Sequence, residues 1–187
     1  LAEHETAADQ VAMADILLVS KVDVVERAAL GELFTDLRAL NSSAEIIEAA
    51  HGGIDPARLF DRSLFQPDDR ADNIGHWLAA VHDHHDHAAH YTSHLICRDG
   101  PLSLAGTGVF LNRVVNEMAE NMLRIKGLVG FREKKGRPAL IHAVQNKFYP
   151  LEWLDDWPDD ERSSRIVFIG RNIDPVRIDE LFESLCV

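Results

Sequence analysis

Hydrophobic positions in the first third of the chain predict alternating strands and helices. Residues 16–19 form a continuous apolar run, typical of a strand buried on both faces of a parallel sheet. A helical period follows over residues 24–40, a second strand is predicted at 45–48, and Asp55-Pro56 favours a short helix that ends near residue 60. Residues 5–14 are predicted to end an earlier helix. This order predicts the closing part of a doubly wound α/β domain.

The pattern after residue 90 predicts a smaller α+β domain. Residues 91–98 alternate like a strand, and apolar residues at three- and four-residue steps predict one long helix over 104–126, ended by Gly127. Further strands are predicted at 128–132, 139–145, 148–153 and 165–170, and Asp174-Pro175 predicts the start of a last helix. We expect a β-α-β-β-β-α set, with an antiparallel sheet and its helices on one face.

Residues 61–94 break both patterns and contain the only low-complexity segment of the chain. We therefore expect an α/β part over 1–73, a histidine-rich linker over 74–94 and the α+β domain over 95–187. The charge distribution supports two units of different role, because residues 1–90 carry 17 acidic and 6 basic side chains and residues 91–187 carry 14 and 13.

Composition excludes several classes of protein. The net charge of −12 disfavours nucleic acid as a partner, since phosphate backbones require a basic surface. No apolar run approaches the ~20 residues that span a bilayer, so we expect no membrane partner, and no secretory signal is visible. The two cysteines, 89 positions apart, form no disulfide framework, which favours a cytoplasmic location. The first residue, Leu1, suggests a fragment.

The sharpest short motif is Ser20-Lys21-Val22-Asp23, directly after the first predicted strand. Open α/β sheets bind ligands at the carboxyl ends of their strands. An aspartate there can accept both N1–H and the 2-amine of guanine, whereas adenine presents an acceptor at N1 and no 2-amine. The stem of Lys21 can pack on the purine face. Taken alone, the motif also fits a solvated turn with a helix-capping aspartate.

Several ordered segments resemble the carboxyl-terminal half of the CobW-type P-loop GTPases, a family of metal-trafficking proteins. The segment QVAMADILLVSKVDVV is similar to the family's helix, strand and guanine-specificity loop, and LNSSAEIIEAAHGGIDPARLF is similar to the segment that follows it. NMLRIKGLVGF, ALIHAVQNKFYPLEW and RIVFIGRNID resemble landmarks of the CobW carboxyl-terminal domain. The resemblance runs from about residue 10 to residue 185.

The resemblance implies a P-loop GTPase part followed by the CobW carboxyl-terminal domain. It implies GTP with Mg²⁺ as cofactor, Zn²⁺ or Co²⁺ as the metal carried, and a client metalloprotein as partner. Ser20, Lys21 and Asp23 would then bind the guanine base, although the family mostly has Asn where Ser20 stands. The 187 residues contain no G-x-x-x-x-G-K-[ST] loop, Walker-B acid or Cys-x-Cys-Cys motif, so we expect no GTP hydrolysis by this chain alone.

A second group of candidate ligands is six histidines within 13 residues: His82, His84, His85, His87, His90 and His94. Neutral imidazole suits Zn²⁺, Co²⁺, Ni²⁺ and Cu²⁺, and Asp83 and Asp86 could bind or orient it. We expect a flexible metal-collecting arm; the alternative is a solvated linker that is rich in histidine.

Two functions from different classes remain open at this point. One is a GTP-dependent metallochaperone, and the other is a non-catalytic module that buffers metal and docks a client. Arg124 and Lys126 are expected to be structural rather than ligand-binding, and Cys97 is expected to be an inert buried thiol. No nucleophile with a partnered base can be assembled from the sequence.

Overall fold

The computed structural model describes residues 5–41, 44–60, 91–158 and 160–186. The chain divides into two compact units, residues 1–89 and 90–187, and each is described by itself. Within the described ranges, no helix is both long enough and apolar enough to cross a membrane.

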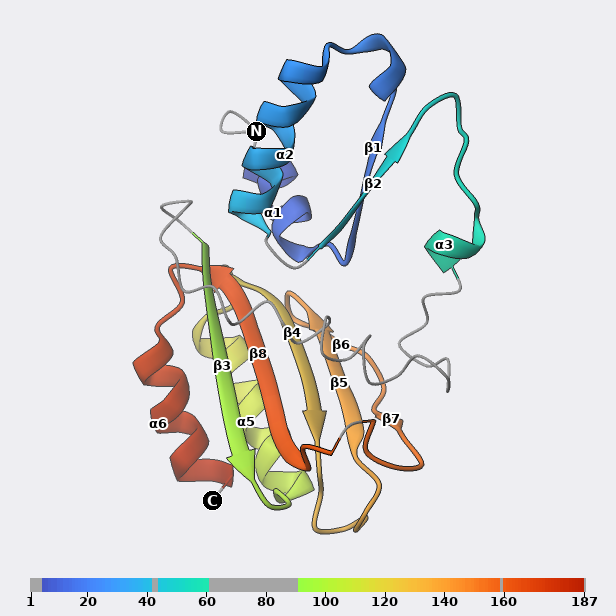
Figure 1. Ribbon diagram of the computed structural model, residues 1–187. Coiled ribbons are helices and arrows are strands. Elements are labelled where there is room, and N and C mark those ends of the chain that lie inside the picture. The colour runs from blue at the N-terminus through green and yellow to red at the C-terminus, as the bar shows by residue number, and fades with distance from the viewer. Residues whose placement is uncertain (1–4, 42–43, 61–90, 159, 187) are drawn as a thin grey trace. The chain divides into compact units, whose positions relative to one another are not determined.

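The first unit has the strand–helix–strand order that its hydrophobic pattern predicts. Its elements in chain order are α1 (Glu5–Met13), β1 (Ile16–Ser20), the 3-10 helix η1 (Val22–Val24), α2 (Arg27–Leu40), β2 (Glu45–Ala49) and α3 (Ala57–Phe60). The two strands pair in parallel, from Ile16 opposite Glu45 to Ser20 opposite Ala49 (Figure 1). The parallel pairing confirms the α/β prediction for this part of the chain.

Asn41 joins the helices of the first unit to its second strand. Its side-chain nitrogen donates to the carbonyl oxygens of Val11 and Ala14, both at 2.8 Å. Its side-chain oxygen accepts the backbone N–H of Ala44 at 2.9 Å. Asn41 is 7% exposed, so these bonds are shielded from water and fix the end of α2 against the end of α1.

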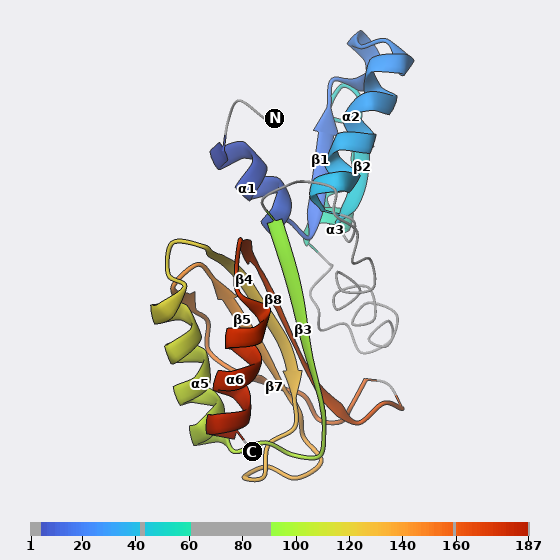
Figure 2. The ribbon, with the colours of Figure 1, turned by 90° about the vertical axis from the view of Figure 1, so that its left-hand side faces the viewer.

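The second unit is an antiparallel sheet with both helices on one face (Figure 2). Its elements are β3 (Tyr91–Asp99), α5 (Leu104–Glu117), β4 (Met122–Val129), β5 (Ala139–Val144), β6 (Lys147–Phe148), β7 (Glu152–Trp153), β8 (Ser163–Arg171) and α6 (Pro175–Cys186). The strand order is β3-β8-β4-β5-β6, with β7 also paired to β5. The last strand in sequence therefore lies between β3 and β4, which gives each of these strands a partner from a distant part of the chain.

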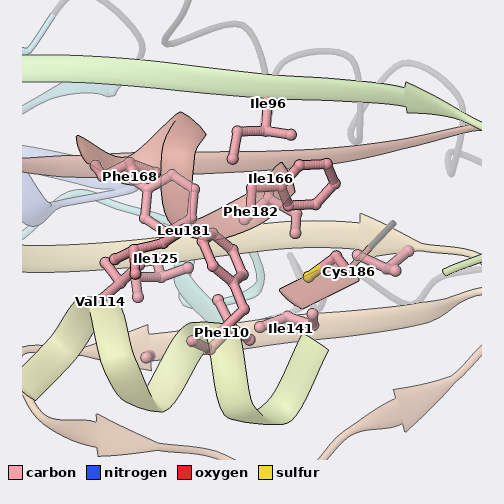
Figure 3. Packing of buried hydrophobic residues seen from close by; sticks show 14 of the residues in the cluster. Ile96, Phe110, Val114, Ile125, Ile141, Ile166, Phe168, Leu181, Phe182 and Cys186 are labelled. Carbon is pink, nitrogen blue, oxygen red and sulfur yellow. The ribbon is translucent and has the colours of Figure 1, made fainter. Parts of the chain in front are cut away.

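The core of this unit lies between α5, α6 and the sheet (Figure 3). The Phe110 ring is fully buried and makes edge-to-face contacts with Phe168 of β8 and Phe182 of α6, at centroid distances of 5.8 and 5.4 Å. Gly106 allows the two helices to approach closely, because a Cβ there would clash with the carbonyl oxygen of Leu185.

An ion-pair cluster ties the end of α5 to the start of α6. Arg177 donates through Nε and Nη2 to the two carboxylate oxygens of Glu117, at 2.9 and 3.2 Å. Arg113 donates to the same carboxylate at 2.6 Å. The hydrogen bonds from Arg177 and then from Arg113 lower the pKa of Glu117 to about 2. Asp174 caps α6 by accepting the N–H groups of Val176 and Arg177.

The predicted long helix over 104–126 is wrong, because α5 ends at Glu117 and β4 begins at Met122. Between them the chain turns, with the N–H groups of Asn121 and Met122 both donating to the carbonyl oxygen of Met118. All eight residues of β4 are buried, so the strand lacks the alternation that distinguishes a strand from a helix. The spacing of its apolar residues continues that of α5, so the pattern predicts one helix across both elements.

Two further boundaries differ from the predictions. The linker was expected to end at residue 94, but β3 begins at Tyr91, since residues 91–94 pair with residues 168–171 of β8. The strand predicted over 148–153 is two short strands, β6 and β7, separated by Pro150, which has no N–H to donate to a ladder.

We expect residues 90–187 expressed alone to unfold in one cooperative thermal transition, because this unit has its own core. A version that begins at residue 95 lacks the first four residues of β3 and should melt at a lower temperature. Circular dichroism at 222 nm and in the aromatic region would measure both. A broad transition for 90–187, with no aromatic signal before melting, would contradict the assignment of a self-sufficient domain.

Candidate functional site

The candidate site is the edge of the first unit where β1 and β2 both end. Ser20 is the last residue of β1 and lies opposite Ala49, the last residue of β2. Because the strands are parallel, the loops that follow them leave from the same edge of the sheet. The predicted loop Ser20-Lys21-Val22-Asp23 is thereby placed beside the loop that begins at Ala50.

Local backbone geometry turns the first loop sharply at Lys21. Lys21 has φ 61° and ψ 30°, in the left-handed region, and the N–H of Val24 donates to its carbonyl oxygen at 3.2 Å. The turn places Asp23 in the single-turn helix η1. Ser20, Lys21 and Asp23 are exposed residues, and the Asp23 side chain itself is 25% exposed, so a ligand can reach this loop.

Asp23 is paired with His51 from the second loop. The Nε2 atom of His51 lies 3.2 Å from Oδ2 of Asp23, and the two side chains are 83% and 25% exposed. The sequence pattern predicts Asp23 as a ligand but gives no prediction for His51. The available signal was the parallel pairing itself, since a polar residue soon after the second strand must lie near the end of the first.

Another ion pair joins α2 to β2. Arg27, at the start of α2, is 3.5 Å from Glu48, the residue before the end of β2. The Arg27 side chain is 85% exposed, so the pair contributes little to stability. Chemically, the edge offers one carboxylate acceptor pair at Asp23, one ammonium group at Lys21 and one imidazole at His51. That set can bind a planar ligand with two adjacent N–H donors.

The structure describes one of the six histidines that were predicted to bind metal. His82, His84, His85, His87 and His90 lie outside the described residues. His94 lies in β3, with its side chain 15% exposed and Nε2 2.7 Å from Oδ1 of Asp179 on α6. Among the described residues, no group of three or more histidine, cysteine or carboxylate side chains is arranged to hold a metal ion.

Arg124 and Lys126, which were expected to be structural, occupy buried positions in the second unit, and His142 is half-buried. Arg124 and Lys126 of β4 are 5% and 3% exposed, and the His142 ring stacks on Tyr149 at a centroid distance of 5.0 Å. The expectation for Cys97 is wrong, because this thiol is exposed, and Cys186 is the buried one. β3 is an edge strand of the sheet, which leaves its outward-facing residues uncovered. Burial raises the pKa of the Cys186 thiol to about 11, so it is inert at neutral pH.

An apolar cavity of about 220 Å³ opens between α5 and the residues that follow β5. Leu104, Leu111, Phe131, Ile141 and Phe148 contribute to its lining. None of the residues predicted to bind nucleotide or metal lines this cavity.

The first unit has a parallel strand pair with an x-K-x-D loop at its carboxyl edge, and an antiparallel α+β domain follows it in the chain. Together these features define a nucleotide-binding α/β protein with an appended domain. The chain belongs to the CobW family: the model for the cobalamin synthesis protein cobW C-terminal domain matches residues 91–186, more than half of the chain. The model for the CobW/HypB/UreG nucleotide-binding domain matches residues 2–48. The predicted family and fold class are confirmed.

Two curated relatives are described as zinc chaperones. Zinc chaperone YjiA from Escherichia coli (strain K12) is 27% identical over 179 residues, which cover 96% of this chain and 54% of the relative. Zinc chaperone CobW from a Sinorhizobium species is 26% identical over 179 residues, covering 89% of this chain and 47% of the relative. The chain therefore spans about half the length of these relatives.

Solved structures of the E. coli protein have the same fold. A crystal structure of a Zn(II)-bound triple mutant of the YjiA GTPase matches 98% of this chain and 55% of the solved chain, with 25% identity and a TM-score of 0.64. The Zn(II)-bound YjiA GTPase without those mutations matches 98% of this chain with 23% identity and a TM-score of 0.62, which supports the fold alone.

Proposed function

We propose that this chain is the guanine-recognition and metal-collecting part of a GTP-dependent metallochaperone that delivers zinc to client metalloproteins. The observation that carries this proposal is the position of Asp23, an accessible carboxylate on a turn at the carboxyl edge of β1, in a chain of the CobW family. Zinc is favoured over cobalt because both curated relatives are zinc chaperones.

Each loop residue has a defined part in base recognition. The two oxygens of Asp23 accept N1–H and the 2-amine of guanine, and the negative charge strengthens both bonds. Lys21 packs its aliphatic stem on the face of the purine, and Ser20 supports the loop. Adenine is rejected because its N1 would point a lone pair at the carboxylate and because it lacks the 2-amine.

The residues of this chain do not fit the phosphates or Mg²⁺. Phosphoryl transfer depends on backbone amides, a lysine and a metal ion positioned around the γ-phosphate. The 187 residues contain no G-x-x-x-x-G-K-[ST] loop to supply them. Base contacts alone leave a net affinity of about millimolar or weaker, since association itself costs at least ~4 kcal/mol.

The metal part of the proposal rests on His82, His84, His85, His87, His90 and His94. Neutral imidazoles bind zinc as cargo, and several of them can replace one another, which suits transfer better than permanent retention. The Nε2 atom of His94 lies 2.7 Å from Oδ1 of Asp179, which leaves Nδ1 as the ring nitrogen available to a metal.

The test of base recognition is Asp23→Asn in an extended form, in which the P-loop half of the E. coli relative is joined in front of residue 1. We expect GTP affinity to fall by about 10- to 100-fold, the cost of one or two hydrogen bonds to a charged group. Affinity for XTP should rise, because the Asn amide can donate to the 2-oxo group that replaces the amine. Calorimetric titration with both nucleotides measures the change.

The matched control is Glu26→Gln, which removes the same charge from an exposed residue three positions away and should leave both affinities unchanged. The unextended chain should show no Mg²⁺-dependent GTP turnover. An unaltered preference for GTP in Asp23→Asn would refute the role of Asp23, and a metal-buffering docking module would then describe the chain better.

A further inference from the structure

Two residues of the candidate site hold backbone conformations that side chains rarely adopt. Lys21 has φ 61° and His51 has φ 50°, one in each loop at the carboxyl edge of the β1–β2 pair. A left-handed conformation costs a residue other than glycine or asparagine about 1 kcal/mol or more. Gly52 follows with φ 72°, and the N–H of Gly53 donates to the carbonyl oxygen of Ala50 at 2.8 Å, so His51 and Gly52 are the two central residues of a tight turn. The turn after β2 therefore fixes the backbone of His51, the residue whose side chain contacts Asp23.

The side chain of His51 contacts the carboxylate of Asp23. The Nε2 atom of His51 lies 3.2 Å from Oδ2 of Asp23, and because a carboxylate only accepts hydrogen bonds, a hydrogen bond here requires the proton on Nε2. The His51 side chain is 83% exposed, and a pair this exposed adds little to folding stability. The contact instead restricts the rotation of the Asp23 carboxylate about χ2, a torsion that otherwise takes a broad range of values.

The contact is compatible with guanine recognition. Each carboxylate oxygen has two lone pairs, which gives Asp23 four acceptor positions. His51 occupies one position on Oδ2, and guanine requires one position on each oxygen. Arg27 is paired with Glu48 at 3.5 Å rather than with Asp23.

We infer that His51 is a positioning residue that fixes the Asp23 carboxylate for a two-point contact with guanine. This inference rests on the proposed guanine site. A carboxylate free to rotate can still make the single bond to N1–H, but it pays an ordering cost to make both bonds at once. His51 therefore determines how strongly the site prefers guanine over hypoxanthine, which has N1–H and lacks the 2-amine.

The experiment compares three variants in the extended form, with GTP and ITP as the two probes. His51→Asn keeps the preference for the left-handed backbone but shortens the side chain, so the donor no longer reaches Asp23. His51→Gln places an N–H donor at the same number of bonds from Cβ as Nε2 of histidine. Arg27→Gln is the matched control, since it removes the other ion pair of this edge and leaves the Asp23 contact intact.

We expect the ratio of GTP to ITP affinity to fall about three- to tenfold in His51→Asn and to stay within about twofold of the unmodified protein in His51→Gln and Arg27→Gln. A merely structural role for His51 would lower both affinities together and leave the ratio unchanged, and that result would overturn the inference. If Asp23→Asn also retained the GTP preference, the proposed guanine site itself would fail. A changed ratio in Asp23→Asn with an unchanged ratio in His51→Asn would reject only the role of His51.

Discussion

Replacing Phe110 by alanine is expected to lower the free energy of unfolding of the carboxyl-terminal unit by about 3–5 kcal/mol. Phe110 has no exposed surface, and its ring lies between Phe168 of β8 and Phe182 of α6. Truncation removes two edge-to-face contacts and leaves a cavity between α5, α6 and the sheet. The surrounding elements cannot close around that cavity, since Gly106 already brings the two helices into van der Waals contact.

The neighbouring Val109 provides the control for this prediction. It lies on the same helix and is 56% exposed, so Val109→Ala should change stability by less than about 0.5 kcal/mol. Urea denaturation of the complete 187-residue chain, followed by aromatic circular dichroism, compares the variants. A loss below about 1 kcal/mol for Phe110→Ala would show that this ring is not central to the core.

The sequence predicts most elements of this fold because their signals are local. β1 and β8 are short apolar runs between turns, and the predicted start of α6 coincides with a capping Asp174 and Pro175. β4 was not predicted as a strand, because burial at all eight positions removes the alternation of exposed and buried residues. Its identity depends on β5 and β8, strands that pair with it from later in the chain. No local pattern carries that information.

The sequence likewise predicts only part of the candidate site. Asp23 and Lys21 follow an apolar strand within a short motif, and the family resemblance extended that motif to guanine recognition. His51 is 28 positions from Asp23 and becomes its neighbour only through the parallel register of β1 and β2. Cys97 illustrates the opposite error, since an apolar context in sequence gave no sign that β3 lies at the edge of the sheet.

The residues proposed for base recognition and those proposed for metal binding occupy different segments of this chain. Asp23 and His51 lie within the first 51 residues, whereas the proposed metal ligands begin at His82. The only one of those histidines in the described part of the chain, His94, belongs to β3 of the carboxyl-terminal unit. Loss of metal binding and loss of base recognition should therefore be separable by mutation.

Replacing His82, His84, His85, His87 and His90 together by alanine is expected to remove most zinc binding, whereas any single replacement should cost little. Interchangeable imidazoles compensate for the loss of one ligand but not of five. Zinc affinity of the unmodified chain should rise steeply between about pH 5.5 and 7.5, because only neutral imidazole binds metal and its unperturbed pKa is about 6.5.

The control for this prediction is His94→Ala, which removes a histidine whose Nε2 is already 2.7 Å from Asp179. That variant should retain most zinc binding and lose some stability of the carboxyl-terminal unit, since the contact joins β3 to α6. Calorimetric titration with zinc at pH 7.5 gives stoichiometry and affinity for each variant. If the fivefold variant binds zinc as the unmodified chain does, the histidine arm is not the metal-binding segment, and if His94→Ala alone abolishes binding, the metal site lies in β3 instead.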